Sequence, residues 1–317
     1  MLTSDQMRFF DEFGYLVVED VLDETATIQP IRAEYSVLMD RLYQTWFEQG
    51  RVSIPPDALD FESKLLNAYQ AGCDWFPPMD ISLPGDRIKA DSPMHCGPAV
   101  FDLLTDRRLL DLVQCLLGSE ITSTPIQHVR IKLPATDVRQ DEIRPHITTT
   151  DWHQDRGVAL AEADQTNMVT VWCAISDATV ENGCLQVIPG GHLQGMKPHC
   201  PKIQTAIPDG LIDEAAAIPL PVKSGGVIVF HPLVPHASLA NTTSSFRWSF
   251  DIRYNKTGEP TGRPQFPEFV ARSQQAPETE LTDWRIWQSL WENARAQLAQ
   301  QAHQNIHRWA SDAPYCA

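Results

Sequence analysis

Hydrophobic and polar positions alternate with a helical period in the first third of the chain. Apolar residues at i, i+3 and i+4 between residues 28 and 46 predict an amphipathic helix. An earlier helix begins near Thr3 or Ser4, with Gln6 three positions after Thr3 as in a capping box, and a short strand follows at 15–18. A further helix is predicted over 99–117, where Gly118 ends it.

After about residue 121 the pattern changes to short apolar runs separated by Gly, Pro and Asn. The last run alternates strictly, which places Trp248 and Phe250 on one face and Arg247 and Ser249 on the other. Many short strands with such turn residues are typical of a sandwich, barrel or jelly roll. The sequence therefore predicts a β core at about 121–255, with strands near 126–133, 168–175, 185–188, 227–230 and 248–254.

Two segments show no clear period and one more helix follows the β core. Residues 51–97 and 134–150 are candidate lid or substrate loops, although a solvent-exposed connection explains 51–97 equally well. The helix is predicted at about 282–302, and its three tryptophans at helical spacing are expected to pack against the sheet. We expect residues 1–317 to form one domain.

Composition and charge exclude several kinds of partner. The net charge of −16 disfavours nucleic acid and anionic membrane surfaces, so a small-molecule substrate is expected. No apolar run is long enough to cross a bilayer, and the start MLTSDQMRFF lacks the features of a signal peptide. The seven cysteines are scattered and never spaced as C-x-x-C, which favours free thiols in a reducing, cytoplasmic location over a disulfide framework.

The stretch TTTDWHQDRGV, residues 148–158, carries the first candidate chemistry. In an extended strand His153 and Asp155 project to the same side, and Gln154 projects to the other. An imidazole and a carboxylate that converge on one point are half of a metal site. Taken alone, an H-x-D triplet is more often a strand end where the two side chains share a hydrogen bond.

The stretch VIVFHPLVPHASLANTTSSFRWSFDIRY, residues 227–254, supplies the missing half. His236 would complete a two-histidine, one-carboxylate set, which leaves three coordination positions open and is characteristic of non-haem Fe(II) oxygenases. A 2-oxo acid can chelate such an iron, and its far carboxylate needs a planar, permanently charged partner. Arg247, eleven positions after His236, fits that role. His231 is a rival ligand, but its spacing to Arg247 is sixteen and Pro232 follows it, so a structural role is expected.

At these residues the sequence resembles the phytanoyl-CoA dioxygenase family of Fe(II)/2-oxoglutarate-dependent dioxygenases. The resemblance covers most of the chain and includes LTSDQMRFFDEFGYLVV, WHQD, VWCAISDATVENGCLQVIPGGH, FHPLVPHAS and FRWSFDIRY. It implies a mainly β protein with flanking helices, a double-stranded β-helix (jelly roll, cupin-like) of two facing sheets. It also implies Fe(II) as cofactor, with 2-oxoglutarate and O2 as co-substrates.

The family pattern also implies roles for individual residues. His153 and Asp155 match the proximal iron ligands, His236 matches the distal ligand, and Arg247 and Ser238 match the residues that hold the distal carboxylate of 2-oxoglutarate. Lys132, Gln127 and Thr170 lie on strands expected to line the same pocket, although each could be an ordinary strand residue. His192, in PGGH, is expected in a turn outside the site.

The resemblance implies oxidation of an unactivated C–H bond with release of succinate and CO2. Related halogenases have Gly or Ala in place of the carboxylate, so Asp155 favours hydroxylation, desaturation or ring formation. A small or apolar metabolite is favoured over an acyl-CoA, since 51–97 has only Arg51, Lys64, Arg87 and Lys89 to meet CoA phosphates. Alternatives are an acyl-CoA hydroxylase, a catalytically silent metal- or metabolite-binding relative, and a zinc enzyme of a cupin-like fold.

Overall fold

The computed structural model describes residues 2–85, 87–201, 204–301, 308–310 and 312–316. In these residues the largest sheet has six antiparallel strands in the order β1-β8-β3-β10-β2-β11. Their bounds are Tyr15–Val18 (β1), Ile121–Lys132 (β2), Met168–Ala174 (β3), Val227–Phe230 (β8), Arg247–Lys256 (β10) and Phe269–Arg272 (β11).

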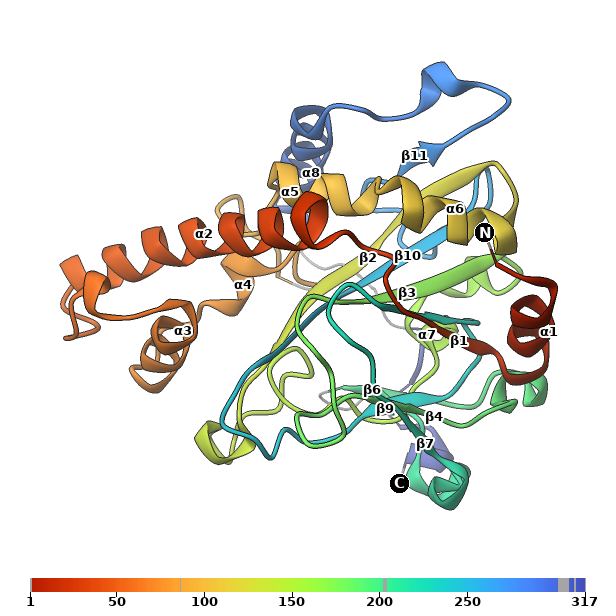
Figure 1. The fold of residues 1–317 in the computed structure, drawn as a ribbon, viewed down its shortest axis with the longest axis horizontal. Coiled ribbons are helices and arrows are strands. Elements are labelled where there is room, and N and C mark those ends of the chain that lie inside the picture. Colours follow the sequence, from red (N-terminus) through yellow and green to blue (C-terminus); the bar gives the residue numbers. More distant parts are fainter. Residues whose placement is uncertain (1, 86, 202–203, 302–307, 311, 317) are drawn as a thin grey trace.

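A smaller sheet lies below the large one in Figure 1 and has the order β7-β4-β9. Its strands are Leu185–Val187 (β4), Ile218–Leu220 (β7) and His236–Ser238 (β9), and a separate ribbon pairs Cys200–Pro201 (β5) with Thr205–Ala206 (β6). Two antiparallel sheets with flanking helices confirm the predicted jelly roll.

Helices cover the side of the large sheet that faces away from the small sheet (Figure 1). The apolar face of β10 packs there, because the ring of Tyr35 lies 5.2 Å from Trp248 and 5.8 Å from Phe250. The polar face of β10 therefore points between the sheets. The helices are Ser4–Phe13 (α1), Gln29–Glu48 (α2), Phe61–Gln70 (α3), Phe76–Met79 (α4), Pro98–Leu104 (α5), Arg107–Leu117 (α6), Asp155–Val158 (α7) and Trp284–Leu298 (α8).

The beginning of the chain folds as its sequence predicts. Thr3 caps α1 in a capping box with Gln6, and Gly14 ends the helix in the left-handed conformation with φ 76°. The strand at 15–18 and the helix after residue 28 are confirmed as β1 and α2. The alternation of β10 is also confirmed, and it buries Arg247, Ser249, Asp251 and Arg253 between the sheets.

Three predictions about helices need correction. The helix expected over 99–117 is two helices, because the Asp106 side chain accepts hydrogen bonds from the backbone N–H groups of Arg108 and Leu109 and starts α6 anew. The segment 51–97 contains α3 and α4, and its aromatic residues Tyr69 and Trp75 are buried in the core. Tertiary packing therefore orders segment 51–97, although its sequence shows no helical or strand period.

The C-terminal helix is shorter than predicted and packs differently. It spans Trp284–Leu298, and the predicted end at residue 302 lies outside the described residues. Its tryptophans face α5 and the segment before β11, since Trp287 lies 6.0 Å from the ring of Phe101 and Trp291 lies 5.3 Å from Phe266. Trp287 and Trp291 therefore pack within the helical layer as well, whereas the sequence predicted packing against the sheet.

The cysteine prediction was wrong for one pair. Cys200 and Cys316 form a disulfide, while Cys73, Cys96, Cys115, Cys173 and Cys184 are free. The bond joins β5 to the end of the chain, a contact that sequence spacing does not reveal. None of the helices in the described part of the chain is both long enough and apolar enough to cross a membrane.

Candidate metal centre

The main chain brings the two candidate histidine ligands together. His153 and His236 form an isolated antiparallel bridge in which His153 N–H donates to the His236 carbonyl at 3.0 Å and His236 N–H donates back at 2.9 Å. Gln154 is extended, and Asp155 then begins α7 instead of continuing a strand. One extended residue between them is enough to point His153 and Asp155 to the same side, as the sequence predicts.

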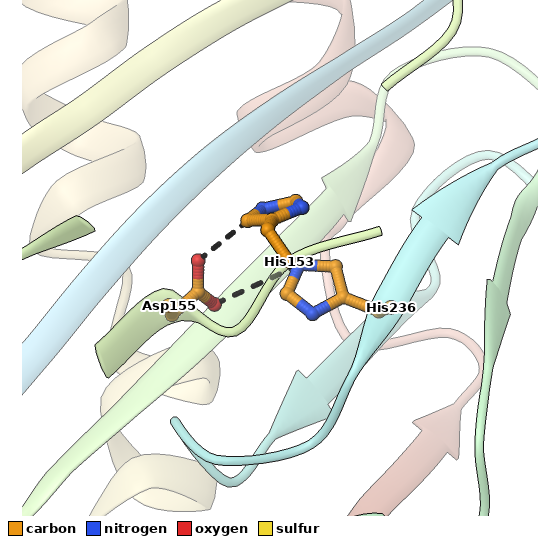
Figure 2. Close-up of side chains that lie close together, drawn as sticks. All are labelled: His153, Asp155 and His236. Atoms are coloured by element: carbon orange, nitrogen blue, oxygen red, sulfur yellow. Dashed lines mark ion pairs between the residues drawn. The ribbon is translucent and has the colours of Figure 1, made fainter. Parts of the chain in front are cut away.

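The three side chains converge on one point between the sheets (Figure 2). The Nε2 atoms of His153 and His236 lie 3.8 Å and 3.9 Å from the two carboxylate oxygens of Asp155, and all ligand atoms lie within 4.8 Å of one another. All three residues are buried. Two imidazoles and one carboxylate in this arrangement match the donor set of a non-haem Fe(II) site.

Carbonyl groups orient both imidazole rings. Nδ1 of His153 donates to the Asp151 carbonyl at 2.9 Å, and Nδ1 of His236 donates to the Val234 carbonyl at 3.1 Å. A proton fixed on Nδ1 leaves the Nε2 lone pair free for a metal. Burial, followed by the neighbouring His236, holds the pKa of His153 well below its usual value, so this imidazole is neutral as a ligand must be.

Arg253 pairs with the candidate carboxylate ligand from inside the barrel. Its guanidinium forms an ion pair with Asp155 Oδ1 and donates to the Ile126 carbonyl at 2.9 Å. Burial alone would raise the pKa of Asp155, but the charge of Arg253 is the largest cause that opposes burial, and that pKa lies well below its usual range. Asp155 is therefore ionised, and its Oδ2 has no hydrogen-bond partner among the described residues.

A second group of predicted residues, Lys132, Ser238 and Arg247, lies beside this triad. Lys132 Nζ donates to Ser238 Oγ at 2.7 Å, and Ser238 is two positions after His236 on β9. Arg247 pairs with Lys132 in the β10–β2 register and lies over the ring of Trp172, which also lines the triad's cavity. The structure thus brings three of the predicted co-substrate residues together.

Arg247 and Lys132 are buried cations without an acidic partner in the described chain. Arg247 donates to Ser249 Oγ at 2.8 Å, and its Nε has no partner. Burial, then the charge of Arg130, lowers the pKa of Arg247 to about 10. Burial, then the charge of Arg247, lowers the pKa of Lys132. Asp251 lies on the same face of β10 as Arg247 but forms its ion pair with Arg130.

The other predicted residues divide between the site and its surroundings. Thr170 lines the cavity of the triad. Gln127 does not reach it, because this residue faces the helical layer and donates to the Ile81 carbonyl at 2.9 Å. His231 accepts from Leu233 N–H at 3.2 Å, which agrees with a structural role. His192 lies in a short 3-10 turn, as predicted.

Sequence reasoning missed Arg253 and the Arg130–Asp251 pair. The alternation of β10 shows Asp251 and Arg253 on the same inward face as Arg247, so the signal was present. It could not show that Arg253 meets Asp155 from α7 or that Asp251 meets Arg130 from β2. Those contacts depend on how the strands pair.

A cavity of about 390 Å³ opens beside His153. Both candidate loops contribute to its wall, with Ser82 and Leu83 from 51–97 and Pro145 and His146 from 134–150. Its size suits a small ligand. The wall is mixed: its polar residues include His128, Arg130, Arg144, His146, Thr150, Gln204 and Arg263, and its apolar residues include Leu83, Ile126, Val158 and Phe266.

The fold and the buried triad define a non-haem iron oxygenase, and comparison with known proteins identifies the family. Residues 10–249 match the family model "Phytanoyl-CoA dioxygenase (PhyH)". The chain belongs to the phytanoyl-CoA dioxygenase family of Fe(II)/2-oxoglutarate-dependent oxygenases and is an oxidoreductase with Fe(II) as cofactor and 2-oxoglutarate and O2 as co-substrates.

Relatives of known name extend over most of the chain. "Phytanoyl-CoA dioxygenase 1" from Oryza sativa subsp. japonica is 34% identical over 79% of this chain and 88% of its own length. "Phytanoyl-CoA dioxygenase, peroxisomal" from Homo sapiens is 24% identical over 80% of this chain and 68% of its own length.

Solved structures share the fold. The non-haem monooxygenase ThoJ has a TM-score of 0.55 and 19% identity, over 92% of this chain and 98% of that one. EvdO2 from Micromonospora carbonacea var. aurantiaca, solved with 2-oxoglutarate, has a TM-score of 0.52 and 20% identity, over 82% of this chain and 94% of that one. At these identities the likeness concerns the fold alone.

Proposed function

We propose that this protein hydroxylates, or otherwise oxidises, an unactivated C–H bond of a small metabolite, with His153, Asp155 and His236 as the iron ligands. The iron with 2-oxoglutarate and O2 would supply the oxidant, and succinate and CO2 would be released. Two observations of fit support the assignment of ligands: the three ligand atoms lie within 4.8 Å of one another, and Asp155 Oδ2 has no other partner in the described residues. Asp155 provides a carboxylate where related halogenases have Gly or Ala, so we do not expect halogenation.

The observation that carries the proposal is the pair of buried cations beside the triad. Lys132 and Arg247 have no carboxylate partner in the described chain, and the charge of Arg247 lowers the pKa of Lys132. Burying two such charges without a counterion is costly. A dicarboxylate co-substrate would supply that counterion, with Arg247 as a two-pronged donor and Ser238 as a further hydrogen-bond partner.

Residues around the triad would prepare the three ligands for the metal and provide space for the substrate. The Asp151 and Val234 carbonyls keep both imidazoles in the tautomer that binds metal, and Arg253 holds Asp155 ionised. The cavity beside His153 would hold the substrate, and the loops 51–97 and 134–150 that contribute to its wall are the candidate lid.

An acyl-CoA substrate is the second candidate, because the named relatives from rice and human carry phytanoyl-CoA in their names. The size of the cavity and its mixed wall favour a small metabolite over an acyl-CoA. For the predicted cytoplasmic location, the five free cysteines count in favour and the Cys200–Cys316 disulfide counts against.

The test is substrate-dependent release of succinate by protein that has been purified without oxygen and loaded with Fe(II). Metal analysis should find iron at one equivalent, and a panel that includes small polar metabolites and phytanoyl-CoA should raise succinate release above the substrate-free rate. Coupled turnover with phytanoyl-CoA alone would replace the proposal by the acyl-CoA alternative. A protein that holds zinc and releases no succinate would contradict both.

A further inference from the structure

Asp80 and His128 form a hydrogen-bonded pair in the wall of the cavity beside His153. His128 Nδ1 lies 2.9 Å from Asp80 Oδ2, and Asp80 Oδ1 accepts from the backbone N–H groups of Ile81 at 2.9 Å and Val129 at 3.1 Å. Asp80 is buried. A fixed carboxylate beside Nδ1 places the imidazole proton on that atom and leaves the lone pair on Nε2.

The Nε2 edge of His128 faces the cavity. Its side chain is 26% exposed and lines the cavity together with His153, while the Nδ1 edge is occupied by Asp80. Within the described residues no protein group forms a hydrogen bond with Nε2. His128 therefore presents a hydrogen-bond acceptor to whatever occupies the cavity.

Three arginines line this cavity, and two of them, Arg130 and Arg144, are paired with acids. Arg130 forms an ion pair with Asp251, and Arg144 lies 2.7 Å from Glu142. Neither pair depends on a ligand for its charge balance. Arg130 and Arg144 thus differ from Lys132 and Arg247, two cations that lack an acidic partner in the described chain.

The neighbouring imidazole adds no charge. His146 lies 4.7 Å from the ring of His128 and stacks on Phe76 at 4.5 Å. Burial, and then the proximity of His128, holds the pKa of His146 well below its usual value. The ring of His128 is thus packed against an uncharged imidazole, which restricts its orientation.

We propose that His128, oriented by Asp80, binds a hydroxyl group of the substrate, and that the substrate is an uncharged alcohol or polyol. The proposal rests on the proposed function for the reaction and adds the chemical class of the substrate. A hydroxyl group can donate a hydrogen bond to the Nε2 lone pair. An ionised carboxylate has no proton to donate, so its lone pairs would repel that of Nε2. An ammonium group would bring a positive charge, and the nearby acids Asp251 and Glu142 are already paired with Arg130 and Arg144.

The probes are cyclohexane-1,4-diol and its dimethyl ether, which share a skeleton but differ in the ability to donate a hydrogen bond. They are titrated into protein loaded with Zn(II) and 2-oxoglutarate and labelled with 15N in its imidazoles, and His128→Phe identifies the resonance. The diol should shift the Nε2 resonance of His128 and bind about tenfold more tightly than the ether, as the loss of one hydrogen bond predicts. In His128→Phe the two probes should bind alike.

Asp80→Asn reverses the polarity of the pair while it keeps the shape. The carboxamide nitrogen would donate to Nδ1 and move the imidazole proton to Nε2, which the 15N spectrum shows directly. The ether should then bind as well as the diol. Affinity for Mn(II), measured by EPR, checks that the metal triad of each variant is folded.

Three results would overturn the proposal: equal affinity of the wild type for diol and ether, failure of the diol to bind, or a His128 Nε2 resonance that the diol leaves in place. These titrations need no turnover. They therefore decide the role of His128 even if the succinate assay fails, and the succinate assay decides the reaction even if His128 has no part in binding.

Discussion

The main chains of His153 and His236 exchange two hydrogen bonds, at 3.0 Å and 2.9 Å, and this bridge sets the position of both imidazoles. Each ring is then turned by a carbonyl two residues before it in the chain, Asp151 for His153 and Val234 for His236. Backbone contacts therefore set the geometry of the candidate metal centre, and each proposed ligand can be tested by itself.

His236→Ala should abolish tight metal binding. Loss of a residue that only orients a ligand costs about 10- to 100-fold in metal affinity, so loss of the ligand itself should cost on the order of a hundredfold or more. Anaerobic Fe(II) titration and Mn(II) EPR measure this. His231→Ala is the matched control and should keep its metal, because His231 is bonded to the Leu233 N–H outside the triad. The opposite result would make His231 the ligand.

Arg247→Lys should raise the KM for 2-oxoglutarate. Lysine keeps the charge but loses the two parallel hydrogen bonds, and a loss of about 2–3 kcal/mol corresponds to roughly thirty- to a hundredfold. The metal affinity should hardly change, since Arg247 does not contact the triad's ligand atoms. A variant with the wild-type KM for 2-oxoglutarate would remove the main support for the co-substrate site.

Arg253→Met should destabilise the metal-free protein. The change leaves the buried Asp155 carboxylate without its cation, and breaking a buried pair costs about 3–5 kcal/mol in the free energy of unfolding. A bound metal ion would replace that charge, so Mn(II) should reduce the loss. Urea denaturation with EDTA and with Mn(II) gives both values.

The control for this variant is Arg139→Met. Arg139 is 47% exposed and pairs with the exposed Asp141 and with Glu142, which keeps its ion pair with Arg144, so loss of Arg139 should cost at most about 1 kcal/mol with or without metal. An Arg253→Met protein as stable as this control would show that Arg253 does not hold Asp155.

The metal-free protein should lose stability between pH 6.5 and pH 4. Burial is the largest cause that lowers the pKa of His199 and of His231 to about 4, from an ordinary value of 6.5. Below pH 6.5 the unfolded chain binds protons that the folded protein refuses, so the free energy of unfolding falls as the pH falls, by at most about 1.4 kcal/mol per pH unit for each histidine. Above pH 6.5 this contribution is fully present.

Urea denaturation at a series of pH values checks this, with His199→Gln as the comparison. Glutamine does not titrate, so the decline of the variant should be less steep than that of the wild type. A stability that stays constant from pH 6.5 to pH 4 would contradict the assignment of both imidazoles as neutral in the folded protein.

The sequence by itself determined the fold class and most of the candidate metal centre. The period of the strands predicts two faces for β10, and the H-x-D spacing predicts that His153 and Asp155 point the same way, because both depend only on local backbone geometry. The distance in sequence from His236 to Arg247 likewise reflects a single connecting loop, residues 239–246, between β9 and β10. Such features depend on residues that are close together in the sequence.

Only the tertiary structure decided which side chains meet across the barrel. Arg253 reaches Asp155, Asp251 reaches Arg130, and Asp80 reaches His128, and in each case the partner comes from an element far away in the chain. The same holds for the Cys200–Cys316 disulfide and for Gln127, which faces the helices because β2 is pleated that way. Local periodicity fixes the direction of a side chain relative to its own strand, but its partner depends on strand order and register, which arise from packing of the whole core.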